Sequence, residues 1–138
     1  AVELGRRLLC LDKRRIRLPA DSLPVLQHYA DRQQEVFICM TLNGAHEVIG
    51  THVVSVGLVN RTMVHPREIF ACAIHDRATA IIVAHNHPSG NCTPSEDDRD
   101  VTERLRQAGH IIGISVLDHI IFTRNGHYYS FMEKGEMG

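Results

Sequence analysis

The chain has 138 residues, a formal net charge of −1 and a hydrophobic share of 43%. A single domain of this size buries most of its apolar surface without disulfides or other cross-links. The near-neutral charge argues against a dedicated nucleic-acid surface. We expect neither a signal peptide nor a membrane partner, because no apolar run approaches membrane-spanning length.

The cysteines predict a reducing environment. Four of them are scattered along the chain without a Cys-x-x-Cys pair, at positions 10, 39, 72 and 92. Cys39 and Cys72 lie in apolar patterns that are typical of reduced core residues. The cytoplasm is the compartment that this pattern favours.

The N-terminal stretch predicts a helix over residues 3–12, with three leucines on one side. Because the chain starts with Ala1 rather than methionine, we interpret residues 1–18 as a helical lead-in from a missing upstream region. Residues 19–138 form the domain in this interpretation. Six of the fifteen basic residues fall within the first seventeen positions. They fit a phosphate-contacting patch or, the interpretation we favour, a solvated face near a domain junction.

Two helices are predicted in the first half of the domain. The first runs to Ala30 and is capped by Asp21 or Ser22. Pro66 opens the second, since proline is favoured at a first helical position, and His65 lies in its cap region. The residues expected to face inward on the second helix are Ile69, Ala73 and Ile74.

A β-hairpin is predicted between these helices. Residues 35–42 are apolar on both faces, which indicates a central strand. Asn43-Gly44 is a strong signal for a two-residue turn. A long strand over residues 46–56 follows, in which Gly50 marks a bend or bulge.

The second half of the domain predicts a strand, a helix and two further strands. The strand covers residues 80–85, and the helix covers 94–108 and stops at Gly109. A strand over 111–123 then leads into a second hairpin turn at Asn125-Gly126.

The last strand ends near Phe131, and the polar tail after Glu133 is expected to fray. Taken together, these elements predict one mixed β-sheet flanked by helices, which is an α/β domain.

A polar cluster follows the buried strand at residues 80–85. If the strand continues through His87, then His85 and His87 point to the same face, because strand side chains alternate. Counting back by three from Val101 on the apolar stripe of the next helix leads to Asp98. A buried carboxylate is costly unless it is paired. A divalent metal held by the two histidines and Asp98 would pair it, and three protein ligands are the composition of a catalytic zinc site.

The start of that helix carries its own signal. Thr93 is expected to be the N-cap, followed by Pro94 at the first helical position and Glu96 as the capping-box acid. Glu96 and Asp97 also fit ordinary first-turn acids favoured by the helix dipole. The sequence contains no His-Glu-x-x-His and no Pro-Cys-x-x-Cys zinc motif.

The spacing of His85-Asn86-His87-Pro88 and Ser95-x-x-Asp98 resembles the JAMM motif of the MPN metalloprotease superfamily. The surrounding segments 64–68 and 116–121 resemble one branch of it, the RadC-like proteins. The resemblance covers nearly the whole chain, from about residue 3 to 131. It implies a cytidine-deaminase-like MPN fold, with zinc held at a strand edge by the two histidines and the aspartate.

The resemblance also implies two catalytic residues. Glu35 stands at the position of the general base in this family, at the start of the first core strand, although an exposed strand-end acid remains the alternative. Glu47 is the second candidate for the base. Ser95 matches the serine whose hydroxyl steadies the developing oxyanion. Cys92, in the loop between the histidines and Asp98, is a weaker candidate for a further zinc ligand.

Three functions remain open at this level. The first is a zinc-dependent peptidase or isopeptidase acting on a protein or peptide substrate. The second is a DNA-repair-associated module, which would contact DNA only through a missing upstream region. The third is a non-catalytic MPN scaffold. The presence of all five motif residues favours the enzyme, since nothing in a scaffold requires all of them.

Overall fold

The computed structural model describes residues 14–56 and 64–137, so the helix predicted over 3–12 lies outside the described residues. Its centre is a five-stranded sheet with the strand order β2-β1-β3-β4-β5. Strands β3 and β4 run parallel, and the other neighbouring pairs run antiparallel. The mixed sheet confirms the α/β prediction. The strands are β1 Val36–Leu42, β2 Val48–Val56, β3 Ala80–Asn86, β4 Ser115–Phe122 and β5 Tyr128–Ser130.

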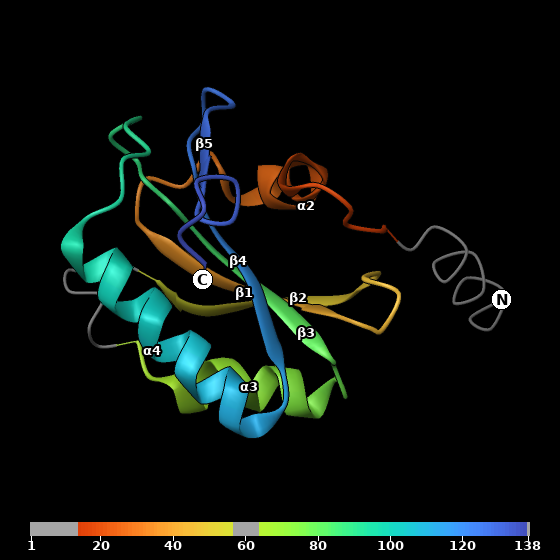
Figure 1. Ribbon diagram of the computed structural model, residues 1–138. Coiled ribbons are helices and arrows are strands. Elements are labelled where there is room, and N and C mark those ends of the chain that lie inside the picture. Colours follow the sequence, from red (N-terminus) through yellow and green to blue (C-terminus); the bar gives the residue numbers. More distant parts are fainter. Residues whose placement is uncertain (1–13, 57–63, 138) are drawn as a thin grey trace, which may run out of the picture.

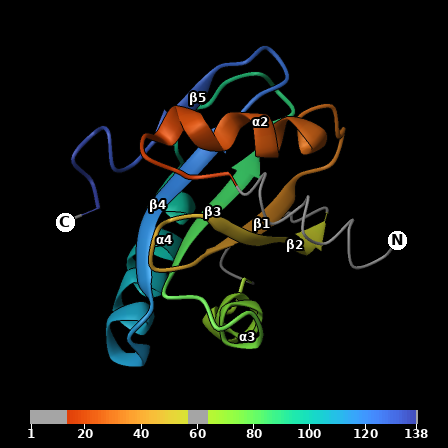
Figure 2. The same ribbon diagram turned by 90° about the vertical axis from the view of Figure 1, so that its right-hand side faces the viewer.

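Helices cover both faces of this sheet. Figure 1 and, after a quarter turn, Figure 2 show α2 on one side and α3 with α4 on the other. None of the helices that the structure describes is long and apolar enough to cross a membrane. The helical elements are η1 Pro19–Ser22, α2 Leu23–Leu26, η2 Gln27–Tyr29, α3 Pro66–His75 and α4 Glu96–Ile112.

Strand β1 is buried along its whole length, as its sequence predicts. Because side chains alternate along a strand, Val36 and Ile38 pack into the core beneath α2, whereas Phe37 and Cys39 pack into the core beneath α3 and α4. Burial of each large apolar side chain contributes about 1.5–3 kcal/mol. The second core is the one that borders the histidines at the end of β3.

The first hairpin differs from the predicted two-residue turn. Asn43 N–H donates to the Glu47 carbonyl at 3.0 Å, which leaves a three-residue loop. The Asn43 side-chain oxygen accepts from the backbone N–H groups of Ala45 and Glu47 and so stabilises the longer loop. His46 takes a left-handed conformation with φ 61° at its end. The strand pairing shifts beside Gly50, between the pair of Thr41 with Gly50 and the pair of Leu42 with Val48, which confirms the predicted bend or bulge.

The helical segment begins with the turn η1 at Pro19, before α2, whose N-cap is Ser22, one of the two predicted caps. Asp21, the other predicted cap, lies inside this first turn. The Asp21 carboxylate reaches back to accept from the backbone N–H groups of Arg17 and Leu18, at 2.9 Å each. The acid therefore satisfies exposed donors at the helix start from within the turn.

Helix α3 begins at Pro66 with His65 as its N-cap, as predicted. Its buried residues include Ile69 and Ala73, but the prediction that Ile74 faces inward is wrong, since 60% of that side chain is exposed. Phe70 is buried instead, three residues before Ala73 and therefore on the same side of the helix.

Helix α4 continues past the predicted stop at Gly109. A side-chain carbon at Gly109 would lie 2.4 Å from the Ile114 carbonyl, so this glycine permits close packing rather than ending the helix. The helix ends at Gly113, which has φ 87°. Ile111 and Ile112 therefore form the last helical turn, and β4 starts later than predicted.

The C-terminal segment is held in place rather than frayed. The Glu136 carboxylate accepts from Tyr129 Oη at 2.5 Å and pairs with Arg99 in the first turn of α4. The Arg99 guanidinium also lies over the Phe131 ring. The tail does not fray directly after Glu133 as predicted, because Arg99, 37 residues earlier in the sequence, and Tyr129 hold Glu136 against the domain.

Candidate metal centre

Two histidines leave the end of β3 on the same face of the sheet. His85 is next to last in β3, and His87 follows after Asn86. Because side chains alternate, the two imidazoles project toward α4 and Asn86 projects the other way. The Asn86 amide accepts from Val36 N–H at 2.6 Å and donates to two carbonyls of the loop before β1, at 3.2 Å each. These hydrogen bonds fix the strand end that carries the histidines.

Asp98 comes from the first turn of α4. Ser95 is the N-cap: its Oγ accepts from Asp98 N–H at 3.1 Å, and Asp98 Oδ2 accepts from Ser95 N–H at 2.8 Å. The predicted cap at Thr93 with Glu96 is therefore wrong. The Thr93 hydroxyl donates instead to the Asn91 side chain at 2.8 Å, within the preceding loop. The capping box leaves Asp98 fully buried and oriented by the backbone.

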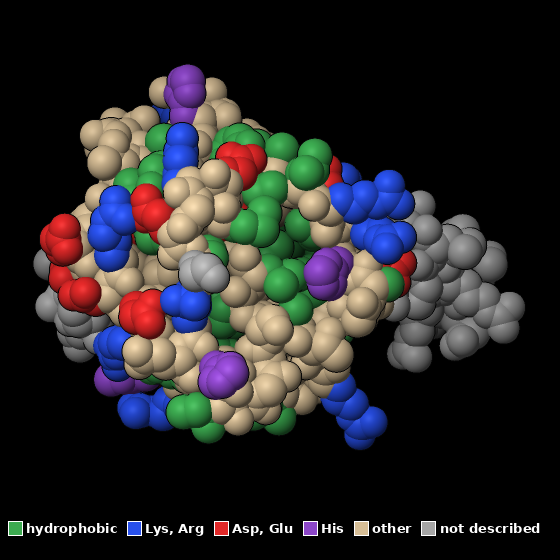
Figure 3. Space-filling view, in the orientation of Figure 1, with side chains coloured by type: hydrophobic (Ala, Val, Ile, Leu, Met, Phe, Trp, Pro, Cys, Tyr) green, Lys and Arg blue, Asp and Glu red, His purple; other side chains and the backbone are tan. Residues whose placement is uncertain are grey.

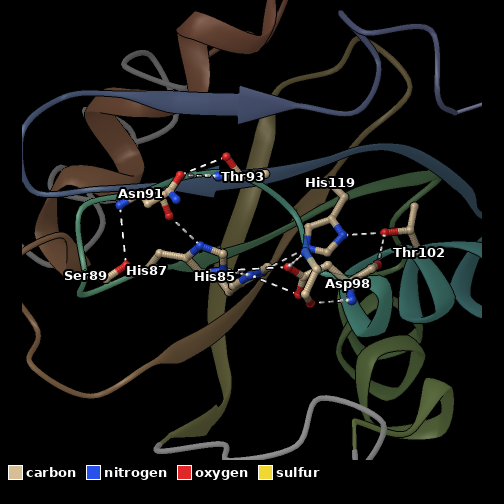
Figure 4. Close-up of polar contacts among 9 residues, drawn as sticks. His85, His87, Ser89, Asn91, Thr93, Asp98, Thr102 and His119 are labelled. Carbon is tan, nitrogen blue, oxygen red and sulfur yellow. Dashed lines mark hydrogen bonds and ion pairs between the residues drawn. The ribbon is translucent and has the colours of Figure 1, made fainter.

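The side chains of His85, His87 and Asp98 converge at one point (Figure 4). The two Nε2 atoms lie 3.0 Å apart. His85 Nε2 lies 3.3 Å from Asp98 Oδ1, and His87 Nε2 lies 3.6 Å from Asp98 Oδ2. Ligand atoms about 2.0–2.1 Å from a tetrahedral zinc stand about 3.3 Å apart. The chemistry and the spacing of these donors therefore fit zinc.

Electrostatics favour the charged form of the carboxylate. Burial by itself raises the pKa of Asp98, but contacts with His85 and His87 and the hydrogen bond from the Ser95 amide outweigh it. The pKa of Asp98 therefore lies well below its usual range. A metal cation or an added proton among the three side chains would stabilise this carboxylate.

Behind the triad lies a histidine that the sequence prediction missed. His119 of β4 is fully buried, and its Nε2 lies 2.9 Å from His85 Nδ1. Its Nδ1 lies 2.5 Å from Thr102 Oγ1 on α4. The His119 ring stacks on Phe131, with ring centroids 4.9 Å apart. The available signal was the polar pair Asp118-His119 within a mostly apolar strand, since such side chains require partners when they are buried.

Of the two proposed catalytic residues, Ser95 contacts the triad through Asp98, and Glu35 directly precedes the strand that pairs with β3. Glu35 is half-buried and directly precedes β1, in which Phe37 pairs with His85 and stacks on its ring. Ser95 is exposed at the start of α4 beside Asp98.

Two further candidates lie outside this group. Glu47 follows the far end of β1, about 20 Å along the strand from its site end, and forms an isolated bridge with Arg15. That position separates it from the triad. Cys92 is a free, half-buried cysteine. It is not part of the converging group of potential metal ligands among the described residues.

A second cluster of histidines and aspartate lies near the end of α3. Asp76 is the C-cap of α3 and is mostly buried. Its Oδ2 accepts from Thr41 Oγ1 at 2.7 Å and lies 2.6 Å from His52 Nε2. Its Oδ1 lies 3.0 Å from His75 Nδ1. Burial by itself raises the pKa of Asp76. The hydrogen bonds from Thr41, His52 and His75 outweigh the effect of burial and lower this pKa to about 2.

Charged side chains are mixed on the face shown in Figure 3. Basic side chains gather at its right edge, and acidic and basic side chains are interspersed on its left side. Within the N-terminal basic run, Arg14, Arg15 and Arg17 are exposed around the buried Ile16. Their exposure is compatible with both a solvated face and a phosphate-contacting patch, so both interpretations stay predictions.

Comparison with known proteins identifies relatives along the whole described domain. The model of the RadC-like JAB domain family matches residues 16–136. A UPF0758 protein of Methanospirillum hungatei is 51% identical over 117 residues, which cover 82% of this chain and 52% of the relative. A UPF0758 protein of Thermotoga maritima is 43% identical over 141 residues, which cover 99% of this chain and 63% of the relative.

A third UPF0758 protein, of Moorella thermoacetica, is 47% identical over 139 residues, which cover 97% of this chain and 59% of the relative. The chain thus spans between 52% and 63% of the length of these three proteins. Their shared name states no activity.

Proposed function

The chain belongs to the RadC-like JAB domain family, and on that premise we propose that it is a zinc-dependent hydrolase of peptide or isopeptide bonds. The observation that carries the proposal is the convergence of His85 Nε2, His87 Nε2 and an Asp98 carboxylate at separations of 3.0 to 3.6 Å. Three protein ligands are typical of catalytic zinc sites, whereas structural sites usually have four.

Zinc in this position supplies a Lewis acid that lowers the pKa of a coordinated water toward ~7. Amide hydrolysis also requires a base that takes a proton from the attacking water and gives it to the leaving nitrogen. We assign this role to Glu35. Its support is the position directly before Val36, whose backbone N–H is held by Asn86 at the end of the histidine strand.

We assign Ser95 the role of donating a hydrogen bond to the oxyanion that develops during hydrolysis. Its hydroxyl oxygen accepts from Asp98 N–H in the helix cap, and a hydroxyl has one proton to donate in addition to its acceptor lone pairs. An exposed O–H at the N-terminus of α4 is well suited to donate to a developing negative charge, which the helix dipole also favours.

The proposed compartment is the cytoplasm. The described cysteines, Cys39, Cys72 and Cys92, are all free, as expected where thiols remain reduced. A protein or peptide is the proposed substrate class.

The first test is metal content and hydrolysis together. Zinc-reconstituted protein should contain about one zinc per chain, and chelation should remove it while the fold largely survives, since two cores are built without the metal. A peptide library incubated with the protein, with and without zinc, should give zinc-dependent fragments by mass spectrometry. Full zinc content with no cleavage of any peptide would favour the scaffold.

The second test separates the base from the metal site. Glu35→Gln should lower the rate of hydrolysis by roughly 100-fold or more, as is typical when general acid–base catalysis is lost, with zinc content unchanged. Glu47→Gln is the matched control and should leave the rate unchanged, because Glu47 follows the opposite end of β1. Equal rates in Glu35→Gln and wild type would remove Glu35 from the mechanism.

A further inference from the structure

We infer that His119 and Thr102 are positioning residues that hold His85 in the tautomer that binds metal. The inference deepens the proposed function, since it concerns one ligand of the same site. It rests on the donors and acceptors along a chain of buried hydrogen bonds that joins β3, β4 and α4 (Figure 4).

The series of hydrogen bonds begins at the backbone carbonyl of Asp98, which can only accept. Thr102 Oγ1 lies 2.7 Å from the Asp98 backbone carbonyl, so the hydroxyl donates its single proton there. The same oxygen lies 2.5 Å from His119 Nδ1. Because its proton is already used, Thr102 accepts in this second contact, and His119 carries a proton on Nδ1.

This assignment determines the next contact. A neutral histidine with its proton on Nδ1 presents a lone pair at Nε2. His119 Nε2 therefore accepts from His85 Nδ1, 2.9 Å away. The neutral His85 ring then presents its own lone pair at Nε2, the atom that faces Asp98. This is the tautomer required of a metal ligand.

His87 is held in the same tautomer by a single hydrogen bond. Its Nδ1 lies 2.7 Å from the Asn91 carbonyl oxygen, which can only accept. Both rings therefore direct lone pairs toward each other and toward Asp98, across 3.0 Å between their Nε2 atoms. A cation between these atoms, or an added proton, relieves the repulsion.

The surroundings of His119 restrict its ring. It is sandwiched by aromatic contacts, stacked on Phe131 at an interplanar angle of 8° and tilted against Phe37 at 60°. Its exposed fraction is 0%, so no solvent water replaces Thr102 as its partner at the surface. The relay also starts on the backbone of Asp98, so it couples the orientations of two ligands.

The test measures zinc affinity by competition with a chelating dye, in variants that separate hydrogen bonding from packing. His119→Phe keeps an aromatic ring against Phe131 but removes both nitrogens, and should weaken zinc binding by about 10–100-fold, as loss of an outer-shell partner does. His119→Gln presents one acceptor and one donor and should restore most of the affinity. His52→Phe, at the Asp76 cluster, is the matched control and should leave zinc affinity unchanged.

A second variant and a direct observation cover the case in which His119→Phe does not fold. Thr102→Val removes the hydroxyl at constant shape and should also weaken zinc binding, whereas Thr102→Ser should not. Nitrogen-15 NMR of the metal-free wild-type protein should show His85 protonated on Nδ1 and unprotonated on Nε2. In Thr102→Val the His85 signals should indicate a mixture of tautomers.

Two results would overturn the relay: a folded His119→Phe protein that binds zinc as tightly as wild type, or a metal-free His85 with its proton on Nε2. Failure of the proposed function is a different result. A wild-type protein that binds no zinc would remove the hydrolase, while the NMR measurement would still decide whether His119 sets the His85 tautomer.

Discussion

Asp76 and Asp98 each lie at a helix end beside two histidines, but the protons around the two carboxylates are arranged in opposite ways. At Asp76 the hydroxyl of Thr41 and one nitrogen each of His52 and His75 surround the ionised carboxylate, which can only accept. Each of these three groups therefore directs a proton toward the Asp76 carboxylate. A negative charge at a helix C-terminus is unfavourable, and these donors compensate for it.

At Asp98 the histidine protons are directed elsewhere. His85 Nδ1 faces His119, and His87 Nδ1 faces a backbone carbonyl, so the remaining nitrogens face the carboxylate with lone pairs. An aspartate beside two histidines is therefore not a metal site by composition alone. The partner on the far nitrogen of each imidazole decides whether the near nitrogen donates a proton or binds a cation.

The largest expected difference between the clusters is in zinc binding. Asp98→Asn keeps an oxygen for the Ser95 cap but removes the charge, and should abolish stoichiometric zinc binding at micromolar zinc. Asp76→Asn should bind zinc as wild type does. Metal analysis after gel filtration measures both. Equal zinc content in the two variants would mean that the clusters do not differ as described.

Acid should weaken both clusters, because the pKa of each carboxylate is lowered in the folded protein, and Asp76→Asn isolates the Asp76 contribution. The pKa of Asp76 is lowered from 3.8 to about 2 in the folded protein, so its contribution is fully present above about pH 4 and is lost as pH falls toward 2. The shift corresponds to about 2 kcal/mol of unfolding free energy. Urea unfolding of the metal-free protein between pH 5 and pH 2 should show this loss, and Asp76→Asn should show correspondingly less of it.

Removal of one hydrogen-bond donor to Asp76 should change stability less than acid does. Thr41→Val removes the hydroxyl that donates to Asp76 at 2.7 Å, and should lower the unfolding free energy by about 1.5 kcal/mol, the lower end for a hydrogen bond to a charged group. Two other donors remain at the carboxylate. Zinc content should not change, and a loss of zinc in Thr41→Val would show that the clusters are coupled.

The smallest effect is expected at Cys92. Because Cys92 is not part of the converging ligand group among the described residues, Cys92→Ser should leave zinc affinity unchanged within error. Dye competition checks this result. A fall in zinc affinity would establish the Cys92 thiol as a fourth protein ligand. The Asp98 cluster would then differ from the Asp76 cluster in its number of ligands as well as in the positions of its protons.

Prediction from the sequence succeeded where the cause is local. Strand β1 is recognised because all seven of its residues are apolar or small enough to be buried on two faces. It failed where two local signals compete. Thr93 and Ser95 both have a carboxylate three residues ahead, and the choice of Ser95 depends on Asn91, which engages Thr93 inside the loop.

At Gly109, too, a local signal gave the wrong prediction. A glycine near the end of a helical pattern predicts a helix stop, but this one lies against the Ile114 carbonyl. Only the return of the chain into β4 reveals that contact. Ile74 is a related error, because an apolar residue near the end of α3 was assigned to the core although 60% of it is exposed.

The metal ligands themselves follow from the sequence. His85 and His87 share a face because strand side chains alternate, and Asp98 faces inward because of helical periodicity. The relay that orients His85 required the tertiary structure. His119 is 34 residues away in the sequence and reaches His85 only because β4 pairs in parallel with β3 after the chain has passed through α4. Local periodicity selects the face on which a side chain lies, whereas long-range pairing selects its hydrogen-bond partner and hence the position of its proton.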